Sequence, residues 1–366
     1  MAQTVPSGVS VGRASPGLWN RLLALAGRNA RMIAPLTTLV AMFIFFSVVT
    51  DVFLTTRNLQ NVITQIGPVA VAAAGVTFVL LCAEIDLSIA SIATFAGVLC
   101  AYFWTEGRIP VVGWEMNFFP EVSLFGWEVT LPIGILIAAL VAAGLGLLNG
   151  FLVSYVGIPS FMMTLAMLTI GAGLAKYVST GKVISEVPSQ LEYLGGAGNR
   201  ILWNTVPVIG VVALAVLIIC DIILSYTKFG RYVYMTGGNR EAAEMSGVNT
   251  RKVVMICLMI SGLTAGLAGL LFIGRLHSAN PAAGGELLIR TIAAVVLGGT
   301  SLFGGEGGIK NTVVGLLIFG VLSNGLNLLP NISIYFKDAL EGIILVAALL
   351  LNVLALRLEK VQTRTE

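Results

Sequence analysis

The sequence has little charge. Only 11% of its 366 residues are charged, whereas 57% are hydrophobic, and the net charge is +3. Soluble domains usually carry about 25% charged residues, so this composition excludes an ordinary soluble protein. The basic residues stand at the ends of apolar runs rather than in one patch, which argues against nucleic-acid binding. With a mean hydropathy of +0.94, the chain is expected to be an integral membrane protein.

Residues suited to catalysis or metal binding are also scarce. The single histidine, His277, has no cysteine or second histidine at ligand spacing, so no metal site is expected. No Ser/His or paired-aspartate arrangement stands out, and no catalytic residue is assigned. The four cysteines form no CxxC pair, lie in apolar runs and are interpreted as buried, inert thiols: Cys82, Cys100, Cys220 and Cys257.

No nucleotide-binding motif is found either. The glycine-rich run at 298–308 is not followed by Gly-Lys-Ser/Thr, and its flanks resemble membrane spans rather than strands. We therefore expect a tight turn there. The chain itself is expected to bind no cofactor, so any ATP must be used by a partner.

Long apolar runs dominate what is present. A membrane span needs roughly 20 apolar residues, and ten runs approach that length: 32–50, 62–85, 88–104, 129–151, 159–178, 206–224, 253–276, 287–302, 312–329 and 336–356. Many of the 42 glycines lie inside these runs, where small residues let helices approach closely. The predicted fold class is an all-α, polytopic membrane helix bundle of about ten transmembrane helices. Residues 32–356 would form one transmembrane domain between tails at 1–31 and 357–366.

The tails and loops predict an orientation. The first 30 or so residues lack an apolar core, so they are not a cleavable signal peptide, and the first run is expected to remain as an anchor. With both termini in the cytoplasm, 13 of the 21 Lys and Arg residues are cytoplasmic, as the positive-inside rule requires. Segments 105–128 and 179–205 would then face outward. Four tryptophans fit an interfacial belt: Trp104, Trp114, Trp127 and Trp203.

An Asn-Gly pair occurs in the fourth run and again in the ninth, at Asn149–Gly150 and Asn324–Gly325. An inverted repeat of spans 2–5 onto spans 7–10 would give such a spacing, because helices five apart have opposite orientations. A chance match explains the pair equally well.

Residues 225–252, here called the handle, are the long polar stretch between two apolar runs. The handle contains GGN-x-EAA-x-x-x-G from Gly237 to Gly247, in which a glycine turn leads into a short helix that ends at another glycine. We expect a cytoplasmic loop that a partner grips. The alternative is an amphipathic connector that packs on lipid headgroups.

Four motifs occur in one order with helical spacing: FLTTRN at 53–58, IDLSIAS at 85–91, the handle motif with its following Val-Asn, and AAVVLGGTSLFGGEG at 293–307. Over residues 35–356 the chain resembles the permease subunits of bacterial ABC importers for simple sugars of the ribose and xylose type. The resemblance implies a subunit that is not an enzyme, sits in the bacterial inner membrane among its lipids and translocates a pentose, hexose or polyol. It also implies three partners: a second, identical permease subunit, a cytoplasmic ATPase that uses ATP and Mg, and an extracytoplasmic sugar-binding protein.

In such importers the EAA-to-Gly loop docks the ATPase. We expect the small side chains of Ala242 and Ala243 to enter a cleft on the ATPase while Arg240 and Glu241 set the orientation. The predicted coupling residues are Gly237, Gly238, Asn239, Arg240, Glu241, Ala242, Ala243 and Gly247. The family's Ile-x-Leu-Pro extension is absent after Gly247, so the far half of the contact is not assigned.

Polar residues inside spans are candidates for the sugar path. A carboxylate costs about 3 kcal/mol at mid-membrane, so Asp86 should face protein or water. It either caps the helix that follows or lines the path, as its IDLS motif would imply; Glu84 stands where the family has a small residue. The asparagines could bond sugar hydroxyls or tie helices together. The candidate path residues are Asp86, Ser88, Ser91, Asn149, Asn324 and Asn327.

Two other classes are kept as alternatives. An ABC permease for nucleosides or branched-chain amino acids would share the same general design. A secondary transporter would need coupling-ion carboxylates or a proton relay at mid-membrane, and the sequence offers only weak candidates for either.

Overall fold

The computed structural model describes residues 30–106, 108–111, 114–117, 123–124, 127–128, 130–185, 187, 189–196, 198–201, 205–330, 332–333, 335–337, 339–347 and 350. The helices are α2 (Ala30–Val49), α3 (Thr56–Leu81), α4 (Ile89–Glu106), α5 (Thr130–Phe151), the π-helical turn η1 (Leu152–Val156), α6 (Ser160–Val178), α7 (Ser189–Gly195), α8 (Val208–Tyr226), α9 (Lys228–Gly238), α10 (Arg240–Met245), α11 (Thr250–Leu276), α12 (Gly285–Leu297) and α13 (Ile309–Leu328). Residues 335–337 and 339–347 are also helical.

The strands are short and lie in loops. They pair as three antiparallel hairpins: β1 (Arg108–Val111) with β2 (Trp114–Asn117), β3 (Ser123–Leu124) with β4 (Trp127–Glu128), and β5 (Arg200–Ile201) with β6 (Val206–Pro207). The prediction of an all-α membrane bundle is confirmed.

A helical stretch occupies each of the ten predicted spans. Among the described residues, six helices are long and apolar enough to cross a membrane, and two shorter apolar stretches occur in α2 and α4. The prediction fits worst at α12, which has 13 residues and is about 20 Å long at 1.5 Å per residue. It ends at Leu297 and not at the predicted Leu302, and the loop that follows contains five glycines with positive φ.

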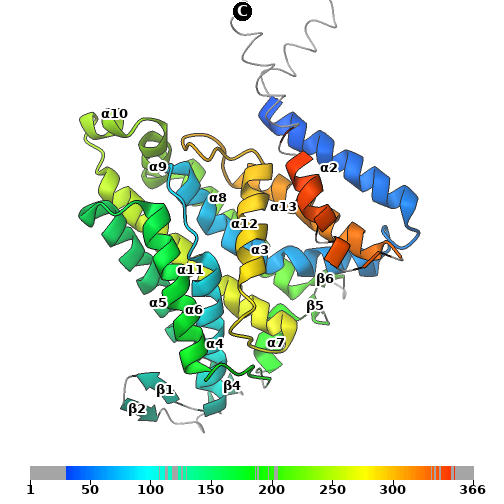
Figure 1. Ribbon diagram of the computed structural model, residues 1–366, viewed down its shortest axis with the longest axis horizontal. Helices are drawn as coiled ribbons and strands as arrows, with labels where there is room; N and C mark the ends of the chain where they lie inside the picture. The colour runs from blue at the N-terminus through cyan, green and yellow to red at the C-terminus, as the bar shows by residue number, and fades with distance from the viewer. Residues whose placement is uncertain are drawn as a thin grey trace, which may run out of the picture.

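Helices α3 and α11 form the centre of the bundle. Every residue of α3 from Gly67 to Leu81 is buried. Helix α3 packs against α8, α11, α12 and α13, and α11 packs also against α4 and α5 (Figure 1). Glycines permit close approaches among these helices, since a Cβ on Gly262 of α11 would lie only 2.8 Å from the Cα of Gly146 in α5.

This packing bears on the predicted repeat. The repeat would relate α3, α4 and α5 to α11, α12 and α13. Helix α11 contacts α4 and α5, and α3 contacts α12 and α13, so each central helix packs against the second and third helices of the other set. This reciprocal packing is what an inverted repeat predicts. The Asn-Gly pairs are less alike, because Asn149 bonds Ser88 just before α4 while Asn324 bonds Asn58 of α3. The helix packing therefore supports the repeat better than the sequence match does.

The two ends of the bundle differ. Helices α9 and α10 lie at one end, and the β1–β2 hairpin, β4 and α7 lie at the other (Figure 1). The handle and the loops predicted to face outward are thus at opposite ends, as expected. Most of the predicted tails lies outside the described residues, as do the side chains of Trp114, Trp127 and Trp203.

Candidate functional site

The handle folds as the sequence predicts. Asn239 caps the start of α10, and its side-chain oxygen accepts a hydrogen bond from Ala242 N at 3.0 Å. Gly247, with φ of +83°, ends the helix, and Val248 N donates to Ala243 O at 3.0 Å. Side chains cap α9 and α11 in the same way, at Thr227 and Asn249. The handle is therefore an ordered pair of short helices.

Exposure separates the handle residues into two groups. Arg240, Glu241 and Ala242 are exposed, and Met245 is 91% exposed. Ala243 is only 1% exposed and packs in the hydrophobic core. The expectation that Ala242 and Ala243 together enter a partner is therefore wrong for Ala243, which is buried within its own chain, where α10 packs against α9 and α11. Sequence reasoning missed Met245, whose exposure no motif indicates.

The handle is fastened to the end of α3. A Cβ on Gly237 would lie 1.7 Å from Leu81 O, so the ends of α9 and α3 are in backbone contact. Gly305 N donates to the same Leu81 O at 2.9 Å. The glycine run at 298–308 is thus a loop folded over the α3–α9 contact (Figure 1), and not the tight turn that was expected.

Tyr234 of α9 also holds this loop. Its hydroxyl donates to Gly307 O at 2.9 Å. Burial, and secondarily the charge of Asp221, raises the pKa of Tyr234. Five glycines in the loop have positive φ: Gly299, Gly304, Gly305, Gly307 and Gly308. Other residues in these positions would raise the conformational energy of the loop, because only glycine adopts positive φ without steric strain.

Residues 82–88, here called the α3–α4 junction, carry two of the six candidate path residues, Asp86 and Ser88. Asp86 is 2% exposed and accepts hydrogen bonds from Ser88 N at 2.9 Å, Ser88 Oγ at 2.5 Å and Ser261 Oγ at 2.7 Å. Its two bonds to Ser88 form an Asx turn directly before α4, and its bond to Ser261 ties the junction to α11. Asp86 thus has a structural role at the entry to α4, in a turn rather than as a cap on the N–H groups of the helix, and Ser261 is a partner that the sequence did not reveal.

Ser91 and Asn149 belong to the same cluster. Asn149 Nδ2 donates to Ser88 Oγ at 3.0 Å, and Ser91 Oγ donates to Met167 O at 3.1 Å. Asn149 Oδ1 is buried without a hydrogen-bond partner among the described residues. Four candidate path residues are therefore brought together where the junction meets α5, α6 and α11.

The other two candidates lie elsewhere. Asn324 is 3% exposed and accepts from Asn58 Nδ2 at 2.9 Å, which ties α13 to α3. Asn327 is exposed, and its backbone oxygen accepts from Lys337 Nζ at 3.1 Å. The structure does not place these residues with the Asp86 cluster, so the six candidates do not line a single passage in this conformation.

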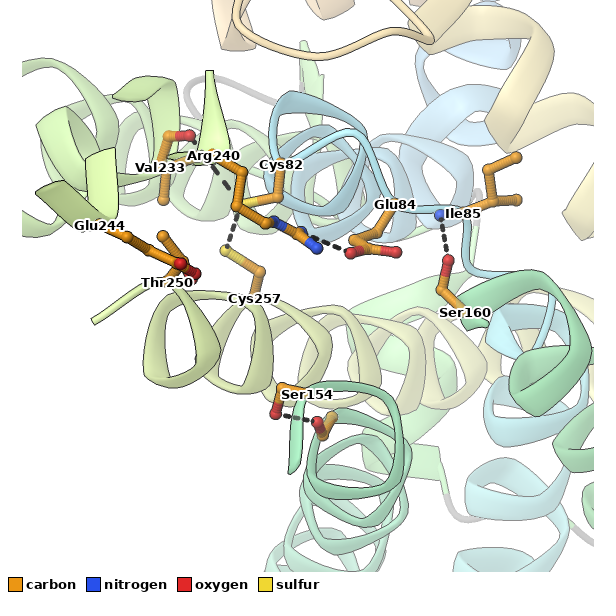
Figure 2. Close-up of polar contacts among 11 residues, drawn as sticks. Cys82, Glu84, Ile85, Ser154, Ser160, Val233, Arg240, Glu244, Thr250 and Cys257 are labelled. Carbon is orange, nitrogen blue, oxygen red and sulfur yellow. Dashed lines mark hydrogen bonds and ion pairs between the residues drawn. The ribbon is translucent and has the colours of Figure 1, made fainter. Parts of the chain in front are cut away.

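An ion pair joins the junction to the handle. Arg240 Nη2 lies 2.6 Å from Glu84 Oε1, with the Glu84 side chain 12% exposed and that of Arg240 47% exposed. The pair borders a cavity of about 330 Å³, which Glu244, Ser160 and Thr250 also line. Figure 2 shows Arg240 directed at Glu84, and Ile85 N donating to Ser160 Oγ beside it at 3.2 Å. The described residues contain no group of three side chains able to hold a metal ion.

A polytopic helical bundle with an ordered polar handle at one end is the architecture of a transport permease. Comparison with known proteins identifies the family of the chain. Residues 58–349 match the family described as the permease component of the branched-chain amino acid transport system. The chain belongs to this permease family.

Similar proteins are found in several bacteria. The chain is 33% identical to the ribose import permease protein of Escherichia coli (strain K12), over 86% of this chain and 92% of that protein. It is 31% identical to the D-allose transport system permease protein of the same strain, over 84% and 87%, and 29% identical to the xylose transport system permease protein of Haemophilus influenzae, over 89% and 97%. No solved structure matches the chain.

Membership of this family confirms three predictions. The chain is a multi-pass membrane protein, it is a transport component rather than an enzyme, and ATP is hydrolysed by a separate ATPase. Permeases of this kind work with an ATPase and with a binding protein.

Proposed function

We propose that the chain is the membrane subunit of an ATP-driven importer that translocates a simple sugar delivered by an extracytoplasmic binding protein. The observation that carries this proposal is the similarity, over 84–89% of the chain, to permeases named for ribose, allose and xylose. The family model is itself described for branched-chain amino acids. An amino acid is therefore the second candidate substrate.

The assembly that we propose contains two identical copies of this chain, a cytoplasmic ATPase and the binding protein. ATP and Mg act at the ATPase, because this chain has no nucleotide-binding motif. The handle and both termini face the cytoplasm of a bacterium and the hairpin end faces outward. The positive-inside distribution supports this orientation, and the start of α2 lies toward the same end of the bundle as α10 (Figure 1).

The sugar path is proposed to pass the Asp86 cluster in another conformation. The hydroxyl and amide groups of Ser88, Ser91 and Asn149 can exchange hydrogen bonds with sugar hydroxyls. In the conformation described here they bond one another and the neighbouring helices instead. Transport would then require α5, α6 or α11 to move away from the junction. Asn324 and Asn327 would contact the sugar elsewhere on the path, at the C-terminal end of α13.

Reconstitution tests the proposed function. Proteoliposomes with this chain, its ATPase and its binding protein should accumulate one of a panel of pentoses, hexoses and polyols when ATP is enclosed with the ATPase. Liposomes with the chain alone, or with a non-hydrolysable ATP analogue, should accumulate none. Concentrative uptake without the ATPase would contradict the proposal in favour of a secondary transporter. Uptake of leucine or valine, but of no sugar, would favour the second candidate.

A further inference from the structure

Three residues of the α3–α4 junction bond three different helices. Leu81, just before it, bonds the loop at 298–308. Ile85 bonds α6 through its N–H and its carbonyl, to Ser160 and Thr164. Asp86 bonds α11, and Ser88 bonds Asn149 of α5. Whatever displaces the junction therefore acts on α5, α6 and α11 together.

Glu84 connects the handle to this junction through its ion pair with Arg240. In the part of the chain that the structure describes, the Glu84–Arg240 ion pair is the one polar contact between α10 and the junction. Arg240 is the first residue of α10, directly after its Asn239 cap. Glu84 stands only two residues before Asp86. A shift of α10 is thus passed to the Asp86 cluster through a short, direct connection.

The surroundings permit such a shift. The cavity beside the ion pair, about 330 Å³ in volume, separates α10 from η1 and the start of α6. Close-packed interiors resist displacement, whereas an open space beside a helix lets it move without overlap. The junction is also irregular backbone, and Ala83 has a φ of +61°, which is unfavourable for alanine. Residues held in such conformations are found where a segment switches between two arrangements.

We propose that the Glu84–Arg240 ion pair transmits movement of α10 to the α3–α4 junction, so that ATP-driven movement of the handle loosens the Asp86 cluster. Glu84 and Arg240 are positioning residues, which act through the residues they hold in place and do not contact the sugar. This inference rests on the proposed function, since it needs an ATPase that moves α10. Glu84 would then not serve mainly to stabilise the fold, because a partly exposed ion pair contributes little stability.

The test compares single and double substitutions in the reconstituted complex. Glu84→Gln removes the attraction at nearly constant volume, and Arg240→Gln removes it with a shorter, uncharged side chain. Because Arg240 is directed at Glu84 of its own chain rather than toward a partner, we expect the ATPase to stay bound and to hydrolyse ATP, while sugar uptake per ATP hydrolysed falls at least about fivefold, the lower range for coupling between two sites. Arg240→Lys, which keeps the charge, should stay within about twofold of the unaltered protein. The exchange Glu84→Arg with Arg240→Glu should restore most of the uptake per ATP.

Glu286→Gln, which removes the ion pair with Arg290 within α12, is the matched control and should have no effect.

The outcomes separate this inference from the proposed function. No ATP-driven uptake by the unaltered complex would overturn the proposed function, and with it the proposed transmission through the Glu84–Arg240 ion pair, here called the link. Normal uptake by that complex, with normal uptake per ATP in both single variants, would overturn the link alone. Loss of ATPase binding in Arg240→Gln would assign Arg240 to docking and also overturn the link. So would a double variant as impaired as the single ones, because a reversed ion pair should transmit movement equally well.

Discussion

At the scale of single residues, Asp86 shows which contacts a sequence can predict. Its bonds to Ser88 are local, since an aspartate side chain readily accepts from the residue two positions further on and forms an Asx turn. Its bond to Ser261 joins residues 175 positions apart. Ser261 is an isolated serine in an apolar run, and nothing in its neighbours indicates a buried carboxylate opposite. The same holds for Asn58 and Asn324, whose contact depends on how α3 and α13 meet.

Ser261→Ala tests how much the long-range contact contributes. The substitution removes a hydrogen bond to a buried carboxylate, so we expect the free energy of unfolding to fall by about 1–3 kcal/mol. Thermal unfolding in detergent measures it. Ser47→Ala is the control, because its hydrogen bond to Phe43 O is exposed and lies within its own helix; it should change stability by less than about 0.5 kcal/mol. Equal losses in the two variants would contradict the role assigned to Ser261.

At the scale of secondary-structure elements, the handle was predictable because its signals are local. The cap at Asn239 and the terminating glycine at Gly247 define α10 from the sequence alone. The shape of the loop at 298–308 was not predictable. Its glycines indicate a turn of some kind, but its path depends on Leu81, more than 200 residues earlier, which accepts the bond from Gly305.

Two adjacent glycines test the contact between α9 and α3. In Gly237→Ala the new Cβ would overlap Leu81 O, 1.7 Å away, so the two helix ends must separate. We expect a loss of about 1–3 kcal/mol in stability, as in other overpacked sites, measured by thermal unfolding. Gly238→Ala is a matched control because a Cβ there meets no atom within 4 Å. It should leave stability unchanged or raise it slightly. Similar melting temperatures for the two variants would show that the close contact is not required.

The exposed face of α10 gives a test of docking. Ala242→Trp and Met245→Asp alter side chains that point away from the chain, so the permease should fold and insert normally. If the ATPase grips this face, both variants should co-purify with little ATPase, and uptake should be lost while the binding protein keeps its affinity for sugar.

Two comparisons complete the docking test. Ala243→Trp should instead lower the amount of folded permease, because Ala243 is buried. Gly247→Arg is a poor probe of docking, since its positive φ would strain any side chain. A connector that only lies on headgroups would accept Trp at 242, so normal ATPase recovery in Ala242→Trp and Met245→Asp would refute docking.

At the scale of the whole molecule, the sequence predicted the class and the ten helical stretches but not which helices are central. Helix α8 is more apolar than α3, yet its most apolar window is 33% buried against 83% for α3. In a membrane the lipid is as apolar as a protein core, so hydropathy does not separate inner from outer helices. The buried helix carries the polar contacts instead: Asn58, Gln60 and Thr77 of α3 all bond groups on other segments.

The orientation of the whole molecule is tested by the accessibility of two serines at opposite ends of the bundle. Ser189 begins α7 and Ser246 follows α10, and both are exposed. The positive-inside distribution places α10 in the cytoplasm and α7 outside. With the four native cysteines replaced, Ser189→Cys should therefore react with an impermeant maleimide in whole cells. Ser246→Cys should react only after the cells are permeabilised. The reverse pattern would invert the proposed orientation, and labelling of both in whole cells would show that the handle does not face the cytoplasm, which would remove the basis for docking an ATPase at α10.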